Sequence, residues 1–312
     1  MWFAPPIYLL IIGIEVLLSN YRKMPVYSWK ETLINFYLSI LNALLDLAIR
    51  GGYLLLLMFF FEQRVISLPH NIFYWCGLVV FMDLMFYWLH RLEHFCRLFW
   101  AVHVTHHSCE NLNVSVAFRA SVFQPLYRFI FFIPLVLCGF RPIDILFVYS
   151  LTQFWSIFVH TELIGKLGWL EYVFVTPSHH RVHHASNDRY LDKNMGMFLI
   201  IWDRMFGTFQ EELPASEYEP IRYGLTQPLE NQTPLSIIFH EWRDIIRDMR
   251  RKDLSFYQKC QYLLRPPGTF SRQNPSDAKG TFAVPLPDVT PQLAKESGGA
   301  AKAVQANAAE ER

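Results

Sequence analysis

The chain has 312 residues, of which 52% are hydrophobic and only 18% are charged. A soluble protein of this size needs more charged residues to cover its surface, and here the hydrophobic residues lie in long runs. The composition therefore excludes an ordinary soluble domain and indicates an integral membrane protein. The 28 Lys and Arg residues nearly balance the 27 Asp and Glu residues. Because nucleic-acid binding needs a concentrated basic surface, we expect no nucleic-acid partner.

The N-terminal part contains two apolar stretches. Residues 1–19 lack a basic start and a small-residue cleavage site, so we expect an anchor helix rather than a signal peptide. The second stretch, 33–61, is longer than one span needs. We expect 41–61 to cross the membrane and the earlier part to lie along the interface. Within this span, Asp46 and Arg50 are four residues apart and are expected to pair on one helix face.

Three further apolar runs follow along the chain. The run 72–90 leads into the first histidine cluster, and the runs 123–138 and 143–160 form a helical hairpin through a turn at 139–142. The sequence thus predicts an all-α membrane protein with about five spans. The basic residues of the loop 20–32 place that loop in the cytoplasm. Alternation of the spans then puts every histidine cluster on the cytoplasmic side.

We expect four regions: anchor helices at 1–65, a membrane-embedded catalytic domain at 66–210, a cytosolic extension at 211–265 and a tail at 266–312. The tail is rich in Pro, Ala, Gly, Ser and charged residues, which bury too little apolar surface to fold alone, so we expect it to be disordered. The sequence has no GxGxxG or GxxxxGK[ST] motif for a nucleotide. Its five cysteines never form CxxC, which argues against disulfides and thiol redox chemistry.

Histidine is the anomaly of the composition, because ten of the twelve lie in three clusters and one isolated position. The first cluster has i, i+4 spacing, and the other two repeat i, i+3, i+4, so on a helix each set occupies one face. Thr176 and Pro177 look like a helix cap and a first-turn proline, which predicts a helix start at the third cluster. Imidazole is a common ligand of zinc, copper and iron. The clustered histidines outnumber the four ligands that a single tetrahedral metal ion accepts. Two metal ions are implied.

The candidate ligands are His90, His94, His103, His106, His107, His160, His180, His183 and His184. His179 is a weaker candidate, because it points about 100° away from His180 on a helix. His70 and His240 lie outside the clusters and are expected to be ordinary surface or interface histidines.

Four polar residues are candidates to orient the imidazoles. Asp83 lies within a span, seven residues before His90 and near the same helix face, so it is a candidate to accept the spare N–H of His90. A helix hydrogen bond to Tyr87 or Arg91 is the alternative. The remaining candidates follow a histidine closely in the sequence: Glu162, Asp192 and Asn194.

Two other functions account for part of the pattern. His90, Glu93 and His94 match H-x-x-E-H, the inverted zinc peptidase motif with Glu93 as the base. That hypothesis leaves eight histidines unexplained. A histidine-lined metal transporter would place its ligands near the bilayer centre. Here the histidines lie at span ends and in the loops beyond, which favours a capped site.

The order of the clusters, with an isolated histidine between the second and third, resembles the fatty acid hydroxylase and sterol desaturase superfamily over about residues 70–210. The branch that contains alkylglycerol monooxygenase and its bacterial relatives is the most similar in the stretches 106–110, 113–119, 155–162, 177–184 and 202–209. Met195 is a departure, because an aromatic residue is usual at that position.

The resemblance implies a helical membrane domain whose cytosolic cap holds a histidine-bound di-iron centre that activates O2. It further implies an oxygenase that hydroxylates or desaturates a sterol, fatty acyl or alkylglycerol lipid, in the bacterial inner membrane or the endoplasmic reticulum. The sequence has no haem, flavin or ferredoxin motif, so electrons come from a partner protein or a diffusible donor; the alkylglycerol branch implies tetrahydrobiopterin. The lipid is expected to enter from the bilayer through a slot lined by residues such as Phe81, Phe86, Tyr87, Phe123 and Phe154. For most of these rings, packing or lipid contact is the favoured alternative role.

Overall fold

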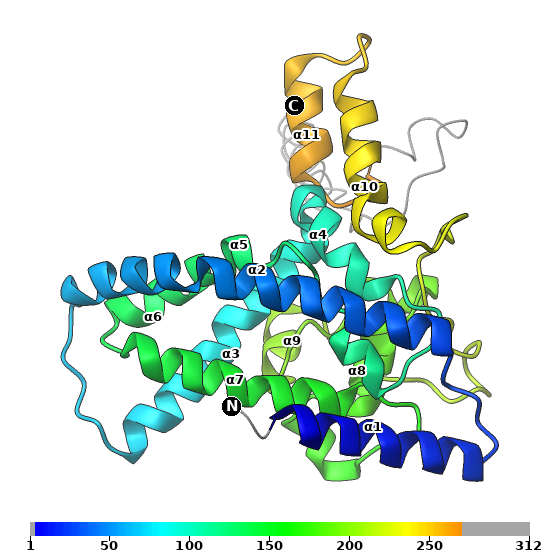
Figure 1. Cartoon of the computed structure of the whole chain (residues 1–312), viewed down its shortest axis with the longest axis horizontal. Coiled ribbons are helices and arrows are strands. Elements are labelled where there is room, and N and C mark those ends of the chain that lie inside the picture. The colour runs from blue at the N-terminus through cyan, green and yellow to red at the C-terminus, as the bar shows by residue number, and fades with distance from the viewer. Residues whose placement is uncertain (1–3, 270–312) are drawn as a thin grey trace, which may run out of the picture.

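The computed structural model describes residues 4–269. In this part of the chain the regular structure is helical, and β-pairing is confined to two isolated bridges. The predicted tail at 266–312 lies outside the described residues apart from 266–269. Long helices run side by side through the body of the molecule, and a helical hairpin projects from it (Figure 1). The α-helices are α1 (Ala4–Tyr21), α2 (Trp29–Glu62), α3 (Ile72–Phe95), α4 (Arg97–His107), α5 (Pro125–Arg128), α6 (Ile133–Leu137), α7 (Pro142–Val159), α8 (Pro177–His184), α9 (Ile201–Phe206), α10 (Pro234–Met249) and α11 (Phe256–Leu264). The short 3-10 helices are η1 (Val114–Phe118), η2 (Phe129–Phe132), η3 (Gly168–Tyr172) and η4 (Asp188–Tyr190).

Within residues 4–269, three helices are long and apolar enough to cross a membrane: α2, α3 and α7. The prediction of about five spans is only loosely supported, because the other two apolar segments form the shorter helices Pro6–Tyr21 and Pro125–Leu137. The second of these is divided into α5, η2 and α6. Pro134 lies at the start of α6 and lacks a backbone N–H, which accounts for the interruption. In α2 the expected interfacial part and the span form one continuous helix of 34 residues.

The surface of these helices is apolar. On α2, Leu44, Leu47, Leu55 and Phe59 have 59–69% of their surface exposed. Large apolar side chains in contiguous exposed rows mark a lipid- or protein-facing surface. Asp46 and Arg50 form the predicted pair one helical turn apart, and Arg128 of α5 also contacts Asp46.

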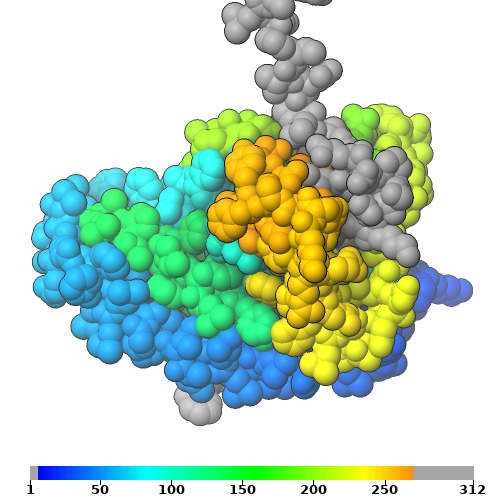
Figure 2. Space-filling model, turned by 90° about the horizontal axis from the view of Figure 1, so that it is seen from above, coloured from blue at the N-terminus to red at the C-terminus, as the bar shows by residue number. Residues whose placement is uncertain are grey.

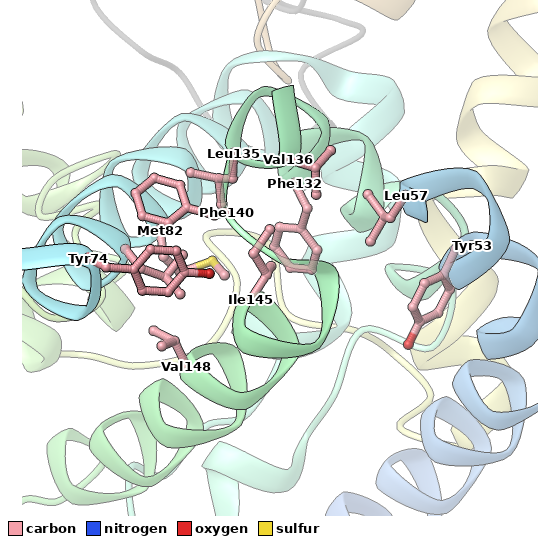
Figure 3. Close-up of a cluster of buried hydrophobic side chains, with 11 residues drawn as sticks. Tyr53, Leu57, Tyr74, Met82, Phe132, Leu135, Val136, Phe140, Ile145 and Val148 are labelled. Carbon is pink, nitrogen blue, oxygen red and sulfur yellow. The ribbon is translucent and has the colours of Figure 1, made fainter. Parts of the chain in front are cut away.

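A buried apolar cluster joins the spans at one end of the bundle. Leu57 of α2, Met82 of α3 and Ile145 of α7 contribute to it (Figure 3). The predicted turn before α7 is present, and Gly139 occupies it with φ +97°. A Cβ atom there would lie 2.3 Å from the carbonyl oxygen of Ile66, so the turn accommodates only glycine.

The hairpin of α10 and α11 is fixed to the bundle through α4 and α2. The guanidinium of Arg97, at the start of α4, contacts Glu241 and Asp248 of α10, each at 2.6 Å. Ile237 of α10 packs into an apolar cluster with Leu38 of α2. Figure 2 shows the yellow surface of α10 beside the blue surface of α2. Arg97 therefore ties the start of α4, just before its histidines, to the hairpin, and the hairpin packs on α2.

Candidate metal centre

Nine histidines from four helices converge on the cytosolic end predicted for the spans. Their ring nitrogens form two groups, and within each group the ligand atoms lie within 4.8 Å of one another. The five-histidine group consists of His90, His94, His103, His107 and His183. The four-histidine group consists of His106, His160, His180 and His184.

The repeated spacing distributes histidines between the two groups. On α4, His103 and His107 belong to the five-histidine group, and His106 belongs to the four-histidine group. On α8 the assignment is reversed, because His180 and His184 join the four-histidine group and His183 joins the other. Positions i and i+4 differ by about 40° around a helix, and i+3 lies on the other side of i. One broad helix face therefore supplies ligands to two neighbouring sites.

Burial disfavours protonation of several of these imidazoles. Eight of the nine are buried, and His106 is half-buried. Burial lowers the pKa of His160 to about 4 and lowers the pKa of His107 and His184 well below the usual range. A neutral imidazole offers a lone pair to a metal, whereas a protonated one does not.

Backbone carbonyls determine which ring nitrogen carries the proton in four of the histidines. The Nδ1 atom of His90 lies 2.8 Å from the carbonyl oxygen of Met195, and that of His183 lies 2.9 Å from the carbonyl oxygen of Lys193. The remaining two pairs are His106 with Arg119 and His160 with Ser156. Since a carbonyl oxygen only accepts, Nδ1 must donate, and Nε2 of each ring is left with a lone pair.

Nε2 atoms of neighbouring rings lie close to one another within each group. Those of His106 and His160 are 3.3 Å apart, although both carry lone pairs in the tautomers just derived. Those of His94 and His183 are buried without a hydrogen-bond partner. Buried acceptors in this arrangement are satisfied by a cation, and a ligand whose other nitrogen donates to a carbonyl is the usual form of metal-bound histidine. The residues present therefore fit two metal ions.

Two carboxylates face the five-histidine group. Asp192 accepts a hydrogen bond from Nδ1 of His94 at 3.0 Å. The other is Glu93, whose Oε2 lies 3.3 Å from Nδ1 of His103. Glu93 is fully buried, and its Oε1 accepts hydrogen bonds from Gln124 and Tyr127. This confinement does not favour Glu93 as the base of a zinc peptidase, and His90 and His94 belong to a larger ligand group.

The prediction that Asp83 contacts His90 is wrong. The Asp83 carboxylate accepts hydrogen bonds at 2.9 Å from the backbone N–H groups of Phe198 and Leu199 and from the indole of Trp202. The alternative contacts, with Tyr87 and Arg91, are not among its hydrogen bonds either. Seven residues correspond to about 10 Å along a helix, which is too far for a direct bond to His90. Asp83 instead fixes the loop that follows Met195.

Glu162 and Asn194 do not contact imidazoles in the described structure. The Asn194 side chain donates to the carbonyl oxygens of His179 and Gln210. Glu162 accepts from the backbone N–H of Leu112 at 3.4 Å. Both residues follow a clustered histidine along the chain, but the chain turns after that histidine, so their side chains do not meet the imidazoles. The turn at Asn194 has φ +54°.

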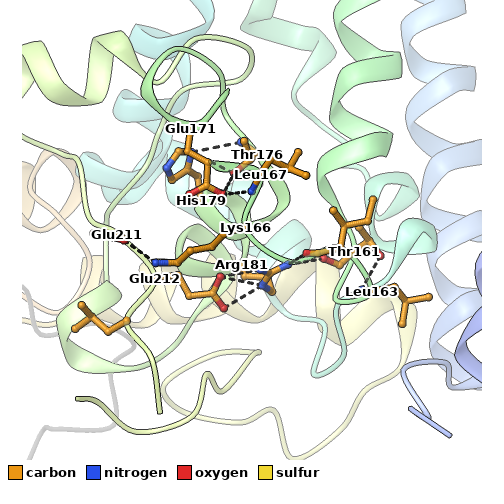
Figure 4. A network of polar contacts seen from close by, with 12 residues as sticks. Thr161, Leu163, Lys166, Leu167, Glu171, Thr176, His179, Arg181, Glu211 and Glu212 are labelled. Atoms are coloured by element: carbon orange, nitrogen blue, oxygen red, sulfur yellow. Dashed lines mark hydrogen bonds and ion pairs between the residues drawn. The ribbon is translucent and has the colours of Figure 1, made fainter. Parts of the chain in front are cut away.

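His179 lies outside both histidine groups. Its Nδ1 accepts a hydrogen bond from the backbone N–H of Thr176, in a capping box at the start of α8 (Figure 4). The predicted helix start, with Pro177 as the first helical residue, is confirmed. Arg181 secures α8 from the side, through an ion pair with Glu212 at 2.7 Å and a hydrogen bond to the carbonyl oxygen of Thr161. Burial also lowers the pKa of His179.

The loop 192–196 contains functional groups that sequence reasoning missed. Its carbonyl oxygens at Lys193 and Met195 accept from two ligand histidines. Asp203 fixes the loop by accepting from the backbone N–H groups of Met195 and Gly196 at 2.6 and 2.8 Å. Met195 contacts His90 through its backbone, and its side chain is buried. The departure from an aromatic residue at this position thus leaves the contact to His90 in place.

A cavity of about 120 Å³ adjoins the histidines. Of the five aromatic residues expected to line a slot, Phe86 lines this cavity, and Phe154 lines a separate apolar cleft with Trp155 and Phe158. The expectation is wrong for Tyr87, which is fully buried and bonded to Thr208. The other two are Phe81 and Phe123, which pack near Phe140 and Phe239, respectively. Aromatic residues in these spans serve mainly in packing.

Residues 75–208 match the model of the family described as fatty acid hydroxylase, and all nine histidines lie in this segment. This segment belongs to the fatty acid hydroxylase family. The chain is 34% identical over 294 residues to the human alkylglycerol monooxygenase, an alignment that covers 92% of this chain and 63% of the human protein. It is also similar to a Delta(7)-sterol 5(6)-desaturase of Gibberella zeae, with 30% identity over 47% of this chain and 44% of the relative. An ornithine lipid hydroxylase of Rhizobium tropici is 33% identical over 38% of this chain and 37% of the relative.

The chain spans less than two thirds of the length of the alkylglycerol monooxygenases it matches, since the alignment with the frog protein covers 51% of that protein. No solved structure matches the chain significantly. The family is therefore assigned from the sequence, and the geometry of the centre comes from the present structure.

Proposed function

We propose that this protein is a membrane-bound di-iron oxygenase that hydroxylates or desaturates a lipid. The observation that carries the proposal is the pair of histidine groups, within each of which the ring nitrogens lie within 4.8 Å of one another. Four of these rings donate Nδ1–H to a carbonyl and keep the Nε2 lone pair. The relatives named monooxygenase, desaturase and hydroxylase support the reaction class. Alkylglycerol, sterol, fatty acyl and polar-headgroup lipids are the candidate substrates.

In this proposal the nine grouped histidines hold two iron ions, with five rings at one ion and four at the other. Bound there, the two iron ions would supply the redox equivalents and open coordination positions that O2 activation requires. Asp192 and Glu93 orient His94 and His103, and the carbonyls of the loop 192–196 orient His90 and His183. His179 is a positioning residue at the start of α8 rather than a ligand.

Electrons come from outside the chain in this proposal. The candidates are tetrahydrobiopterin and an electron-transfer protein, since no motif for a bound haem, flavin or iron–sulfur cluster occurs in the sequence. We further propose that residues 66–210 form the catalytic domain, that 1–65 anchor it and that 211–265 extend it on the cytoplasmic side. The membrane is the bacterial inner membrane or the endoplasmic reticulum.

Metal analysis of the purified, iron-loaded full chain tests the proposal. About two iron ions per chain are expected, because each histidine group suffices for one ion. A single ion, or zinc in place of iron under iron-replete growth, would contradict it. Lipid profiles of cells with and without the gene then identify the substrate. Disappearance of one oxidised lipid on deletion is expected, and unchanged profiles under aerobic growth would argue against a lipid oxygenase.

A further inference from the structure

The cavity beside the metal centre is lined by polar side chains as well as by histidines. On α7, Tyr149, Gln153 and Ser156 line it, followed by His160 at the end of the helix. These positions are three or four residues apart, so they share one face of α7. The opposite wall includes the segment that carries Gln124 and Arg128. A pocket for plain hydrocarbon would need none of these amides and charges.

Most of the polar side chains in this wall are already bonded to the protein. Gln124 donates to Glu93 at 2.8 Å, and Asn42 donates to the carbonyl oxygen of Ser121 at 2.8 Å. Arg128 donates to Asp46 at 2.7 Å, and its guanidinium lies 4.5 Å from the centre of the Tyr149 ring. These contacts fix the wall, so the side chains that make them need no substrate group as a partner.

Gln153 differs from these neighbours. Its Nε2 atom is buried and has no hydrogen-bond partner in the described structure. A buried amide donor without an acceptor is unfavourable, and such a group in a binding cavity is expected to find its acceptor in the ligand. The residue is also placed in a candidate membrane span, where polar side chains facing an interior cavity are functional candidates.

We propose that the Gln153 amide donates a hydrogen bond to an oxygen atom of the lipid substrate and so determines its class. This inference rests on the proposed lipid oxygenase function. Gln153 lies seven residues before His160, about 10 Å along the axis of α7. The recognised oxygen and the carbon presented to the histidines are therefore separated by a comparable distance. The structure thus favours a lipid oxidised within about 10 Å of a hydroxyl, ether or carbonyl oxygen, and disfavours one oxidised further along an unfunctionalised chain.

Binding measurements on the full chain in detergent test the inference without turnover. The probes are two matched pairs, 1-O-hexadecylglycerol with hexadecane and cholesterol with cholestane. We expect the wild type to bind at least one oxygenated probe more tightly than its hydrocarbon partner. Gln153→Met, which keeps the length of the side chain, should lower the affinity for that probe by about five- to tenfold, which corresponds to the loss of one hydrogen bond. Binding of the hydrocarbon should stay within about twofold, since a hydrocarbon makes no hydrogen bond to the amide that the change removes.

Thr152→Val is the matched control, because Thr152 lies on the same helix, lines the separate apolar cleft and bonds to its own helix at Tyr149. It should bind all four probes as the wild type does. Thermal unfolding and iron content of both variants show whether the Gln153 variant folds and keeps its metal centre. A variant that fails there is replaced by Gln153→Leu, which also lacks the amide donor and should also lose the preference. The inference is overturned if the wild type does not distinguish the members of either pair, or if Gln153→Met binds the oxygenated probe as tightly as the wild type. Selective binding by a chain that holds no iron would overturn the proposed function alone.

Discussion

The two histidine groups are defined at the level of single atoms by tautomers. Four ligand rings donate Nδ1–H to backbone carbonyls, so their Nε2 atoms are available to metal. Cluster spacing in the sequence predicts which histidines assemble. It does not predict how they divide, because the division between His106 and His107 depends on how α4 crosses α3, α7 and α8. The backbone carbonyls that accept Nδ1–H could not be predicted from the sequence either, because every residue type has a backbone carbonyl.

Alanine substitutions should separate the two groups. His106→Ala and His183→Ala each remove one ligand, from the four- and the five-histidine group respectively. We expect each variant to stay in the membrane, to lose most of its activity and to retain about one iron ion instead of two, because each group is built around its own ion. Metal analysis of the membrane-extracted protein measures this. His70→Ala is the control, since His70 is exposed and pairs with Asp144 away from the centre. Full iron content and turnover in His106→Ala would remove that residue from the ligand set.

Asp83→Asn should weaken the loop next to the centre. The carboxylate accepts three hydrogen bonds, two of them from backbone N–H groups, and an Asn side chain offers one oxygen and a competing donor. We expect a loss of about 2 kcal/mol in the free energy of unfolding and reduced iron content, since hydrogen bonds to charged groups are the stronger ones. Thermal unfolding and metal analysis measure the two effects. The exposed Glu62→Gln serves as control. Normal stability and iron content would show that the loop holds without the charge.

At the scale of elements, α8 depends on its surroundings more than on its own sequence. It has eight residues, all of them buried, and four of these are histidines. The Thr176–Pro177 cap was predictable because capping signals are local. The support from Arg181 was not, because Glu212 lies 31 residues further on and the pair forms only when the chain returns. The interruption between α5 and α6 shows the same limit, because an apolar run predicts burial or lipid contact and does not predict helix continuity.

Glu212→Gln should loosen α8 and so affect both metal sites. The variant removes the charge that faces the buried guanidinium of Arg181, and breaking such a pair costs about 3 kcal/mol when one charge stays buried and unpaired. Because α8 supplies histidines to both groups, iron should be lost from both rather than from one. Glu219→Gln is the matched control, since Glu219 pairs with Arg222 in an exposed contact that contributes little. Equal iron content in the two variants would show that the pair does not hold α8 in place.

At the scale of the whole molecule, the metal centre is the point where spans and cap meet. α3 and α7 are candidate spans, and α4 and α8 belong to the part beyond them. The apolar cluster that joins α2, α3, α6 and α7 includes Leu57, Leu78, Leu135 and Ile145, and none of the nine histidines belongs to it. Apolar packing therefore secures the spans, whereas the convergence of the cap on the spans leaves imidazole lone pairs facing one another. We therefore expect the folded state to reach its full stability only when those lone pairs have a partner.

Removing iron should therefore destabilise the cap more than the spans. A ligand bound only by the folded state adds about 2.7 kcal/mol of stability at a concentration one hundred times its dissociation constant. We expect the chelated protein to unfold at a temperature several degrees lower than the iron-loaded protein, and amide hydrogen exchange to increase in α4 and α8 before it increases in α2. Adding iron should restore both quantities. Magnesium should not, because it prefers oxygen ligands and the centre offers imidazole nitrogens. If chelation removes the iron and leaves the unfolding temperature and the exchange of α8 unchanged, hydrogen bonds and packing alone hold the cap against the spans, and the facing Nε2 atoms carry no energetic cost.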